Sequence, residues 1–412
     1  PKRRCDKQPM TITPSLHAKL PFTALAGALA LAAAMGFGRF SFTPILPGMM
    51  TDLHLLPADA GLIAAANFLG YLLGAVLAGQ GWAAGRERLI ALSSLLATSL
   101  LLAAMALTQH VGLFMVIRFL SGVASAFAMI FTSSIVLAHI STHASVQGGE
   151  YGQSTHFGGV GLGIAASSLM VYALPHLFGP HLFGTSASAG WRLDWLAGAG
   201  LTFVVFFVVS LLLPRVRKTE VRAEQEPPLS WGRPFLLLFT SYGLFGFGYV
   251  VTATFIVTMA RMANAGPVAE FLAWFLAGIM AAASLFVWRP VLDRLGLAGA
   301  YSLALLLAAI GVFASVGLPG MAAPLVGAAL LGSTFMTITA YGLRLARALA
   351  PASPRKALSI MTAAFGVGQT IGPLVAGWLA AISGSFALPS LVAGAVLLVS
   401  LILAASLWRK TV

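Results

Sequence analysis

The stretch Gly-Phe-Gly-Arg-Phe at residues 36–40 places Arg39 inside an apolar region that runs from Phe22 to Met49. The pattern returns 210 residues later as Gly-Phe-Gly-Tyr-Val at residues 246–250, again within an apolar region. A half-length repetition of this kind indicates that the chain consists of two related halves. The charge buried in the first copy indicates that the two halves enclose something polar.

The composition places the chain in a membrane. Of its 412 residues, 59% are hydrophobic and 8% are charged, whereas a soluble globular protein carries about 25% charged residues. Apolar stretches such as 22–49, 89–107 and 191–213 reach or exceed the roughly 20 residues that cross hydrocarbon as a helix. The chain is long enough for about twelve such helices.

The predicted fold is all-α and integral to the membrane, with twelve transmembrane helices in two bundles of six. We expect the helices at residues 22–49, 61–81, 89–109, 112–138, 153–175, 191–213, 233–260, 267–288, 297–317, 322–346, 357–382 and 386–408. We expect a cytoplasmic N-terminal segment over residues 1–17, an N-terminal bundle over 18–213, a cytoplasmic loop over 214–232 and a C-terminal bundle over 233–412. Residues 1–9 have no apolar character and are left out of the fold prediction.

Basic residues segregate to one side of these helices. All but four of the 24 Lys and Arg residues fall on the side of the termini; Arg192 and Arg261 lie on the other side, and Arg39 and Arg118 lie inside helices. Because basic loops remain in the cytoplasm, both termini are predicted to be cytoplasmic. The lipid bilayer thus accounts for the net charge of +13, and no nucleic-acid partner is expected. The first apolar run far exceeds the 7–15 residues of a signal-peptide core, so we expect it to be retained.

Several kinds of chemistry are excluded by what the sequence lacks. Cys5 is the only cysteine, so neither a disulfide framework nor a thiolate metal site is possible. No nucleotide-binding loop of the form Gly-x-x-x-x-Gly-Lys-Ser/Thr occurs. We therefore predict no cofactor, no metal site and no catalytic residue, and we expect a proton gradient to supply the driving force.

The two halves run in the same direction through the membrane. Gly85 and Gly296 follow equivalent helices at a spacing of 211 residues, and Phe-Gly pairs at 157–158 and 365–366 recur at a spacing of 208. Parallel repeats of this kind place a substrate site between the halves near the midplane, which rocking of the halves opens to each side in turn. The pattern is typical of a transporter.

These features resemble the major facilitator superfamily over nearly the whole chain, from Ala18 to Trp408. Residues 36–47, with Pro44 and Pro47, and residues 243–255 resemble a branch of bacterial permeases that mostly lack assigned substrates. The resemblance implies a multi-pass protein of the bacterial inner membrane. Such a protein moves a small organic solute by alternating access, as a symporter or antiporter, and we expect it to be a monomer.

Arg118 begins the run RFLSGVASA, which ends at Ala126. The run is similar to the family's Arg-x-x-x-Gly-x-x-x-Ala signature, whose arginine is tied to proton coupling in several members. A guanidinium in hydrocarbon costs at least ~2.5–3.5 kcal/mol, so we expect Arg118 to face a cavity or a partner. Snorkelling to the outer headgroups is the alternative. Gly122 and Ala126 are interpreted as packing residues.

Arg39 lies about ten residues, or ~15 Å, from the outer end of its helix, which is too deep for easy snorkelling. The family places helices 1, 4, 7 and 10 around its cavity, so the resemblance implies that Arg39 and Arg118 share the outer half of that cavity. Neither has an obvious carboxylate partner in the sequence. Two such cations favour an anionic or amphipathic substrate, because guanidinium groups bind carboxylate or phosphate in bidentate fashion. The alternative is that Arg39 bonds backbone carbonyls or a structural Asp.

Neutral polar residues complete the predicted binding surface, although each of them more often bonds its own helix. The predicted substrate-binding residues are Arg39, Thr43, Arg118, Tyr249, Thr254, Thr337, Tyr341 and Gln369.

Proton coupling and gating are expected at separate places. The chain lacks the mid-membrane Asp or Glu that many proton-driven relatives use, so Arg118 and His156 are the coupling candidates; a histidine ordinarily titrates near pH ~6.5. A structural hydrogen bond is the alternative for His156. The loop after the second helix resembles the family's gating loop only partly, because Trp82 stands where its Asp is expected. The predicted gating residues are Gly85, Arg86, Asp293, Arg294 and Gly296.

An integral-membrane enzyme and a channel are the alternative classes of protein. An integral-membrane enzyme would need clustered chemical groups, and the only hint is His139, His143 and Glu150, whose spacings match no motif. A channel would leave a continuous pore, against which the internal repeat argues.

Overall fold

The structure is a computed structural model that describes residues 20–178, 190–214 and 226–411. Within these ranges every regular element is a helix. In chain order they are α1 (Leu20–Leu31), the π-helix η2 (Ala32–Phe37), α2 (Phe42–Leu53), α3 (Pro57–Ala78), α4 (Glu87–Met105), α5 (Val111–His143), α6 (Val146–Phe178), α7 (Gly190–Leu212), α8 (Arg233–Met262), α9 (Pro267–Val287), α10 (Arg289–Gly317), α11 (Ala322–Leu349), α12 (Pro354–Ser383) and α13 (Ala387–Thr411). Twelve helical segments in these ranges are long and apolar enough to cross a membrane, and the first of them joins α1, η2 and α2. The predicted fold class is confirmed.

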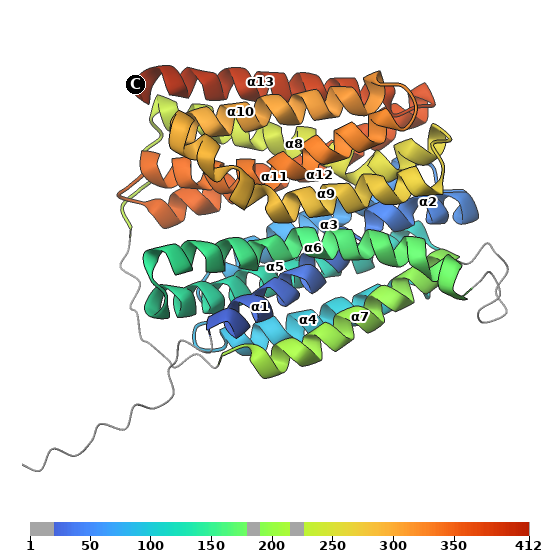
Figure 1. The fold of residues 1–412 in the computed structure, drawn as a ribbon, viewed down its shortest axis with the longest axis horizontal. Coiled ribbons are helices and arrows are strands. Elements are labelled where there is room, and N and C mark those ends of the chain that lie inside the picture. Colours follow the sequence, from blue (N-terminus) through green and yellow to red (C-terminus); the bar gives the residue numbers. More distant parts are fainter. Residues whose placement is uncertain (1–19, 179–189, 215–225, 412) are drawn as a thin grey trace, which may run out of the picture.

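The helices form two bundles that lie side by side, with α8–α13 above the earlier helices in Figure 1. Across the boundary α3 packs against α12, and α6 packs against α9. α3 and α9 begin 210 residues apart, at Pro57 and Pro267, while α6 and α12 begin 208 residues apart, at Val146 and Pro354. The two interfaces are therefore made by equivalent helix pairs, as a two-fold relation between the halves requires.

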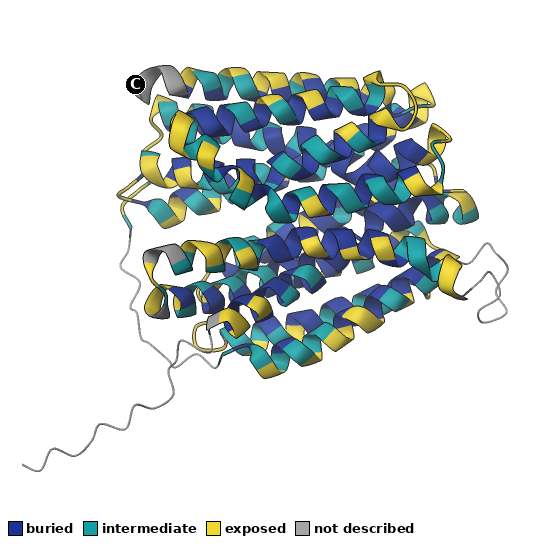
Figure 2. Ribbon diagram, in the orientation of Figure 1, coloured by how far each residue is buried: buried dark blue, intermediate teal, exposed yellow. Residues whose placement is uncertain are grey.

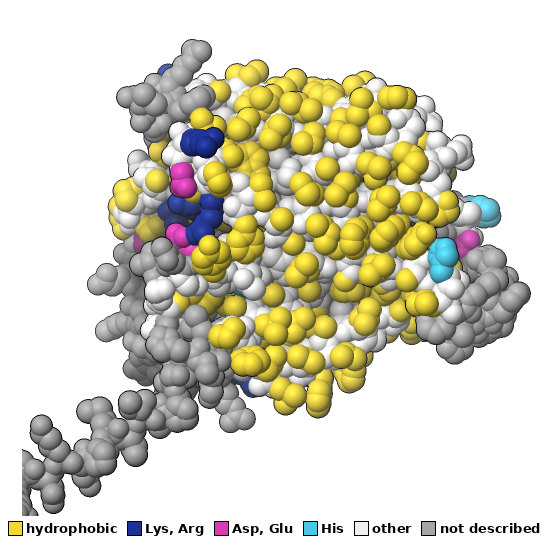
Figure 3. All heavy atoms as spheres, viewed as in Figure 1, with side chains coloured by type: hydrophobic (Ala, Val, Ile, Leu, Met, Phe, Trp, Pro, Cys, Tyr) yellow, Lys and Arg dark blue, Asp and Glu magenta, His cyan; other side chains and the backbone are white. Residues whose placement is uncertain are grey.

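The two ends of the structure differ in charge. We call the end at which α1 and α8 begin the basic end. Its described basic residues are Arg86, Arg88, Arg233, Arg289, Arg294, Arg344, Arg347, Arg355 and Lys356, whereas Arg192 and Arg261 lie at the opposite end. Figure 3 shows apolar side chains covering the face between the ends, with Lys and Arg gathered at one of them.

The sides of the bundle have a surface suited to lipid. Phe203, Phe207 and Ile402 are all at least half exposed, with exposed fractions of 50%, 60% and 64%. In Figure 2 the buried residues lie where helices face one another. Large exposed apolar side chains of this kind are compatible with hydrocarbon as the surrounding solvent.

The first span is broken, although residues 22–49 were predicted as one continuous helix. After α1 the backbone widens into η2, turns over residues 38–41 and resumes as α2. Pro44 has no N–H to donate to the carbonyl of Phe40, one turn earlier, and its ring crowds that carbonyl. Pro47 lies inside α2, which continues past it. The equivalent positions in the second half are Thr254 and Val257, and there α8 remains continuous.

Glycines let the helices approach more closely than side chains would allow. A Cβ atom added to Gly70 on α3 would lie 2.0 Å from the carbonyl oxygen of Phe119 on α5. One added to Gly122 on α5 would lie 2.1 Å from the carbonyl oxygen of Asn67 on α3. Gly122 therefore serves packing, as predicted.

A glycine in the left-handed region follows the second span of each half. Gly85 has φ +75° and Gly296 has φ +65°. Only glycine adopts this backbone conformation without strain. Gly296 lies at a kink within α10, and Gly85 lies in the loop before α4. Both positions require glycine, which extends the repeat from sequence to backbone conformation.

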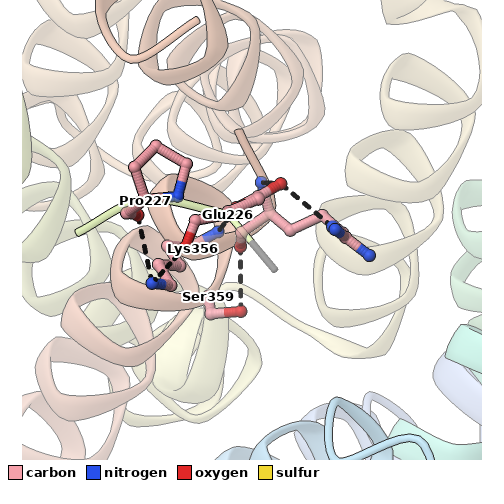
Figure 4. Close-up of polar contacts among 5 residues, drawn as sticks. Glu226, Pro227, Lys356 and Ser359 are labelled. Atoms are coloured by element: carbon pink, nitrogen blue, oxygen red, sulfur yellow. Dashed lines mark hydrogen bonds and ion pairs between the residues drawn. The ribbon is translucent and has the colours of Figure 1, made fainter. Parts of the chain in front are cut away.

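Glu226 joins the described end of the central loop to α12 (Figure 4). Its carboxylate accepts hydrogen bonds from the backbone N–H groups of Arg355 and Lys356, each at 3.0 Å, and from Arg355 Nε at 2.9 Å. Desolvation raises the pKa of Glu226, but these hydrogen bonds and the charge of Arg355 outweigh it, so the pKa lies below its ordinary value. An ionised carboxylate at a helix N-terminus satisfies N–H groups that have no partner within the helix.

Gly122→Ala should destabilise the protein, because the added methyl group meets the α3 backbone. Such overpacking costs about 1–3 kcal/mol, more than the roughly 0.5–1 kcal/mol that alanine gains over glycine within a helix. Gly112→Ala is the matched control on the same helix, since an added Cβ there meets nothing within 4 Å. Thermal unfolding in detergent should show a lower melting temperature for Gly122→Ala alone; equal melting temperatures for the two variants would contradict the packing argument.

Candidate functional site

Arg39 lies at the break in the first span, where the two bundles meet. Its side chain is only 3% exposed. Its Nη2 donates a hydrogen bond of 2.7 Å to Oε1 of Gln369, on α12 in the other bundle. The guanidinium group therefore connects the halves near the middle of the first span.

Aromatic rings surround this guanidinium. Its central carbon lies 4.2 Å from the ring centre of Tyr71, 4.6 Å from that of Phe68 and 5.4 Å from that of Phe40. Each such contact stabilises a desolvated cation by up to about 2 kcal/mol. In the described part of the chain no carboxylate pairs with Arg39, and its Nε has no hydrogen-bond partner. The charge is thus stabilised but not neutralised.

Gln369 links Arg39 to Tyr249, since its Nε2 donates a hydrogen bond to the Tyr249 hydroxyl. The Tyr249 ring stacks on Phe335 and Phe365, with ring centres 5.9 and 5.6 Å apart. Tyr249 stands 210 residues after Arg39, so it occupies the equivalent position in the second half. The site therefore joins two equivalent positions that carry different chemistry.

Arg118 stabilises the broken helix. It is 2% exposed, and its Nη1 and Nη2 donate hydrogen bonds to the carbonyl oxygens of Gly38 at 3.0 Å and Arg39 at 2.8 Å. Both acceptors lie in the turn where the regular α-helical bonding is interrupted. The snorkelling alternative is therefore wrong. The side chain holds the backbone that carries Arg39, and it satisfies two buried carbonyls.

Thr43 also connects the bundles. Its hydroxyl donates a 2.8 Å hydrogen bond to the carbonyl oxygen of Ala253, the residue at the equivalent position 210 residues later. A contact between equivalent positions lies on or near the axis that relates the halves. The first span and α8 therefore meet at this axis, one turn from Arg39.

The remaining predicted binding residues are placed less closely together. Thr254 is buried on α8, and Thr337 is buried on α11 with no partner for its hydroxyl. Tyr341 donates to the carbonyl oxygen of Trp288 at 3.3 Å, about 9 Å along α11 from Phe335 towards the basic end. Arg39, Tyr249 and Gln369 thus form one cluster with Thr43 and Arg118 beside it, and Tyr341 lies apart.

His156 is buried within the first bundle. Its Nε2 lies 2.8 Å from the Ser133 hydroxyl, its ring contacts Phe157, and its Nδ1 has no hydrogen-bond partner. A Cβ added to Gly27 on α1 would lie 2.3 Å from that Nδ1, so the ring fills a space that only glycine leaves. The side chain is hydrogen-bonded to Ser133, and its Nδ1 faces the backbone of Gly27.

The predicted gating residues lie at the basic end. Gly85 and Gly296 form the equivalent turns, and Asp293 and Arg294 are exposed. Among the described residues Asp293 has no ion pair. An ion pair between the bundles instead joins Arg289 to Glu150.

Sequence reasoning did not single out the aromatic lining or that ion pair. Phe68, Tyr71, Phe335 and Phe365 are scattered over three helices, and a single helix shows no pattern that marks them. Glu150 lies on α6 and Arg289 on α10, so their pairing depends on how the two bundles dock. Tyr151, beside Glu150, adds a ring 5.2 Å from the guanidinium carbon of Arg289.

Comparison with known proteins identifies the family to which the chain belongs. The profile of a family described as "Uncharacterised MFS-type transporter YbfB" matches residues 31–405. No curated protein matches the chain significantly. Among solved structures, the nucleoside transporter NupG has a TM-score of 0.71 at 15% identity, covering 95% of this chain and 99% of that one. A bacterial homologue of the human lysosomal transporter Spinster, inward-facing and unoccupied, has a TM-score of 0.71 at 14% identity, covering 96% and 97%. These similarities concern the fold.

Arg118→Lys should destabilise the protein even though the charge remains. One ammonium group cannot reproduce the paired hydrogen bonds to two carbonyls, and hydrogen bonds from a charged group are each worth about 1.5–3 kcal/mol. Thermal unfolding in detergent should show a clear loss of stability, whereas Arg192→Lys at the opposite end should change little. Wild-type stability of Arg118→Lys would show that the carbonyl contacts are dispensable.

Proposed function

The chain belongs to the family described as uncharacterised MFS-type transporter YbfB, within the major facilitator superfamily, and we propose that it transports a small organic acid with an apolar, aromatic body. Membership makes it a multi-pass membrane protein and a secondary transporter that works by alternating access, not an enzyme. The identity of the solute is the part that we add. The alternative of a channel does not fit this family.

One observation carries the proposal: Arg39 is buried between the bundles with no carboxylate partner among the described residues. A guanidinium in hydrocarbon is costly, by at least ~2.5–3.5 kcal/mol, and a bound carboxylate would neutralise it through charge-assisted hydrogen bonds. The acceptor that occupies it now is the neutral amide of Gln369. A carboxylate binds a guanidinium more strongly than a neutral amide does, so an anion can displace that amide.

The aromatic rings favour an acid with a flat, apolar body. Tyr249, Phe335 and Phe365 present nearly parallel rings, with interplanar angles of 1° and 2°. Aromatic pairs gain about 0.5–1.5 kcal/mol beyond the burial of their area. An aromatic carboxylate would place its charge at Arg39 and its ring among these side chains.

Both bundles contribute to this site, since Arg39 comes from the first span and Gln369 and Tyr249 from the second half. Rocking of one bundle against the other would therefore separate Arg39 from its partners. We assign this role to the cluster, with one chain supplying the complete site as a monomer. The basic end faces the cytoplasm of a bacterial inner membrane in this proposal, in line with the positive-inside rule.

We assign proton coupling to His156. It is fully buried, and the described groups around its ring, Gly27, Ser133 and Phe157, carry no charge. A neutral imidazole has one nitrogen that can accept a proton. Protonation would place a charge among uncharged neighbours, which would favour the conformation that exposes the ring to water.

Arg39→Gln should remove the preference for acids while leaving the protein folded. Binding of benzoate, measured by isothermal titration, should weaken roughly tenfold to hundredfold, because a charged donor contributes about 1.5–3 kcal/mol. Wild-type protein should bind benzoate more tightly than benzamide, and the variant should not distinguish them. Arg192→Gln is the control for loss of a remote charge. Unchanged benzoate affinity in Arg39→Gln would refute the proposed site.

His156→Gln should uncouple transport from the pH gradient. In proteoliposomes the variant should lose gradient-driven accumulation of benzoate but keep counterflow, since exchange requires no net proton movement. His176→Gln, an exposed position on the same helix, should behave as wild type. Accumulation that persists in His156→Gln would show that the proton is carried elsewhere.

A further inference from the structure

Trp274 on α9 is the feature that the proposed function leaves unused. Its side chain is 2% exposed, and its indole Nε1 has no hydrogen-bond partner. Two other buried tryptophans do have acceptors: Trp195 donates to the sulfur of Met49 at 3.4 Å, and Trp288 donates to the carbonyl oxygen of Ser333 at 2.7 Å. The packing of this protein thus provides partners for buried indoles elsewhere.

An unpaired buried N–H group is costly. Leaving it without an acceptor costs about 1–3 kcal/mol, and hydrocarbon offers no water to replace the missing partner. An indole N–H only donates, so whatever satisfies it must be an acceptor. A hydroxyl group such as that of Thr337 can both donate and accept, so it would leave the chemistry of the missing partner open. The indole N–H does not.

Trp274 lies beside the Arg39 cluster. It belongs to the second bundle, whereas Arg39 belongs to the first. The Phe40 ring centre is 5.4 Å from the guanidinium carbon of Arg39 and 6.3 Å from the Trp274 ring centre, so these two groups are at most about 12 Å apart. Arg39 has its own unpaired Nε. One small molecule is long enough to reach both donors.

We propose that Trp274 is a specificity-determining residue that donates a hydrogen bond to a second acceptor on the substrate, distal to its carboxylate. This inference rests on the proposed function. The substrate class becomes an aromatic acid that carries a carbonyl, hydroxyl or second carboxylate oxygen at its far end. The carboxylate binds the first bundle at Arg39, and the far oxygen binds the second bundle at Trp274, so the molecule spans the boundary that moves.

The test uses two acids of nearly the same shape, para-acetylbenzoate and para-isopropylbenzoate, which differ by a ketone oxygen in place of a methyl group. Affinities of wild-type protein, Trp274→Phe and the control Trp195→Phe are measured by isothermal titration. Wild-type protein and the control should prefer the ketone by roughly tenfold, the worth of one net hydrogen bond. Trp274→Phe should lose this preference while binding the isopropyl acid within about twofold of wild type, which also shows that it is folded.

Two kinds of failure are distinguishable when Arg39→Gln is measured with the same acids. If wild-type protein binds neither acid, or binds both without needing Arg39, the proposed function fails, and this inference fails with it. If both acids need Arg39 but Trp274→Phe keeps the ketone preference or weakens both acids equally, only the inference fails. Equal weakening would mean that the indole serves packing against Phe40.

Discussion

Two buried guanidinium groups lie in the interior of a membrane protein with no carboxylate paired to either among the residues that the structure describes, and the arrangement of the centre follows from this constraint. The Arg118 side chain bonds to the backbone, because its two terminal nitrogens donate hydrogen bonds to carbonyl oxygens of the interrupted first span. The Arg39 guanidinium donates a hydrogen bond to one neutral amide and contacts three aromatic rings. One arginine is therefore structural, and the other keeps an unneutralised charge at the boundary of the bundles.

The repeat explains why the site lies where it does, and the differences between the copies explain its chemistry. Arg39 and Tyr249 occupy equivalent positions, and Thr43 contacts its own counterpart, Ala253. The first copy carries prolines that interrupt the helix, whereas α8 continues without a break. The two equivalent spans thus differ in what they place at the centre. The first carries the Arg39 cation on an irregular turn, and α8 carries the stacked Tyr249 ring on a regular helix.

Much of the fold could be predicted from the sequence, because membrane spans are specified locally by length and apolarity. Twelve spans, the parallel repeat and the depth of Arg39 follow from that pattern. The break at residues 38–41 does not follow from Pro44 and Pro47, because prolines in a transmembrane helix are compatible with a continuous span when neighbours satisfy the freed backbone groups. The sequence predicts Arg39, Gln369 and Tyr249 only as members of one binding surface. The hydrogen bond from Arg39 to Gln369 depends on docking between the bundles, and the ring contacts of Arg39 with Tyr71 and Phe68 depend on packing between helices of the first bundle. No local sequence pattern records either.

The central claim is that Arg39 is the anion-binding group of the transport site, and a structure determined by cryo-electron microscopy with bound benzoate tests it most directly. The carboxylate should lie within about 3 Å of the Arg39 guanidinium nitrogens. The ring should lie among Tyr249, Phe335 and Phe365, with the amide of Gln369 displaced. Benzoate bound elsewhere, with the hydrogen bond from Arg39 to Gln369 intact, would contradict this claim.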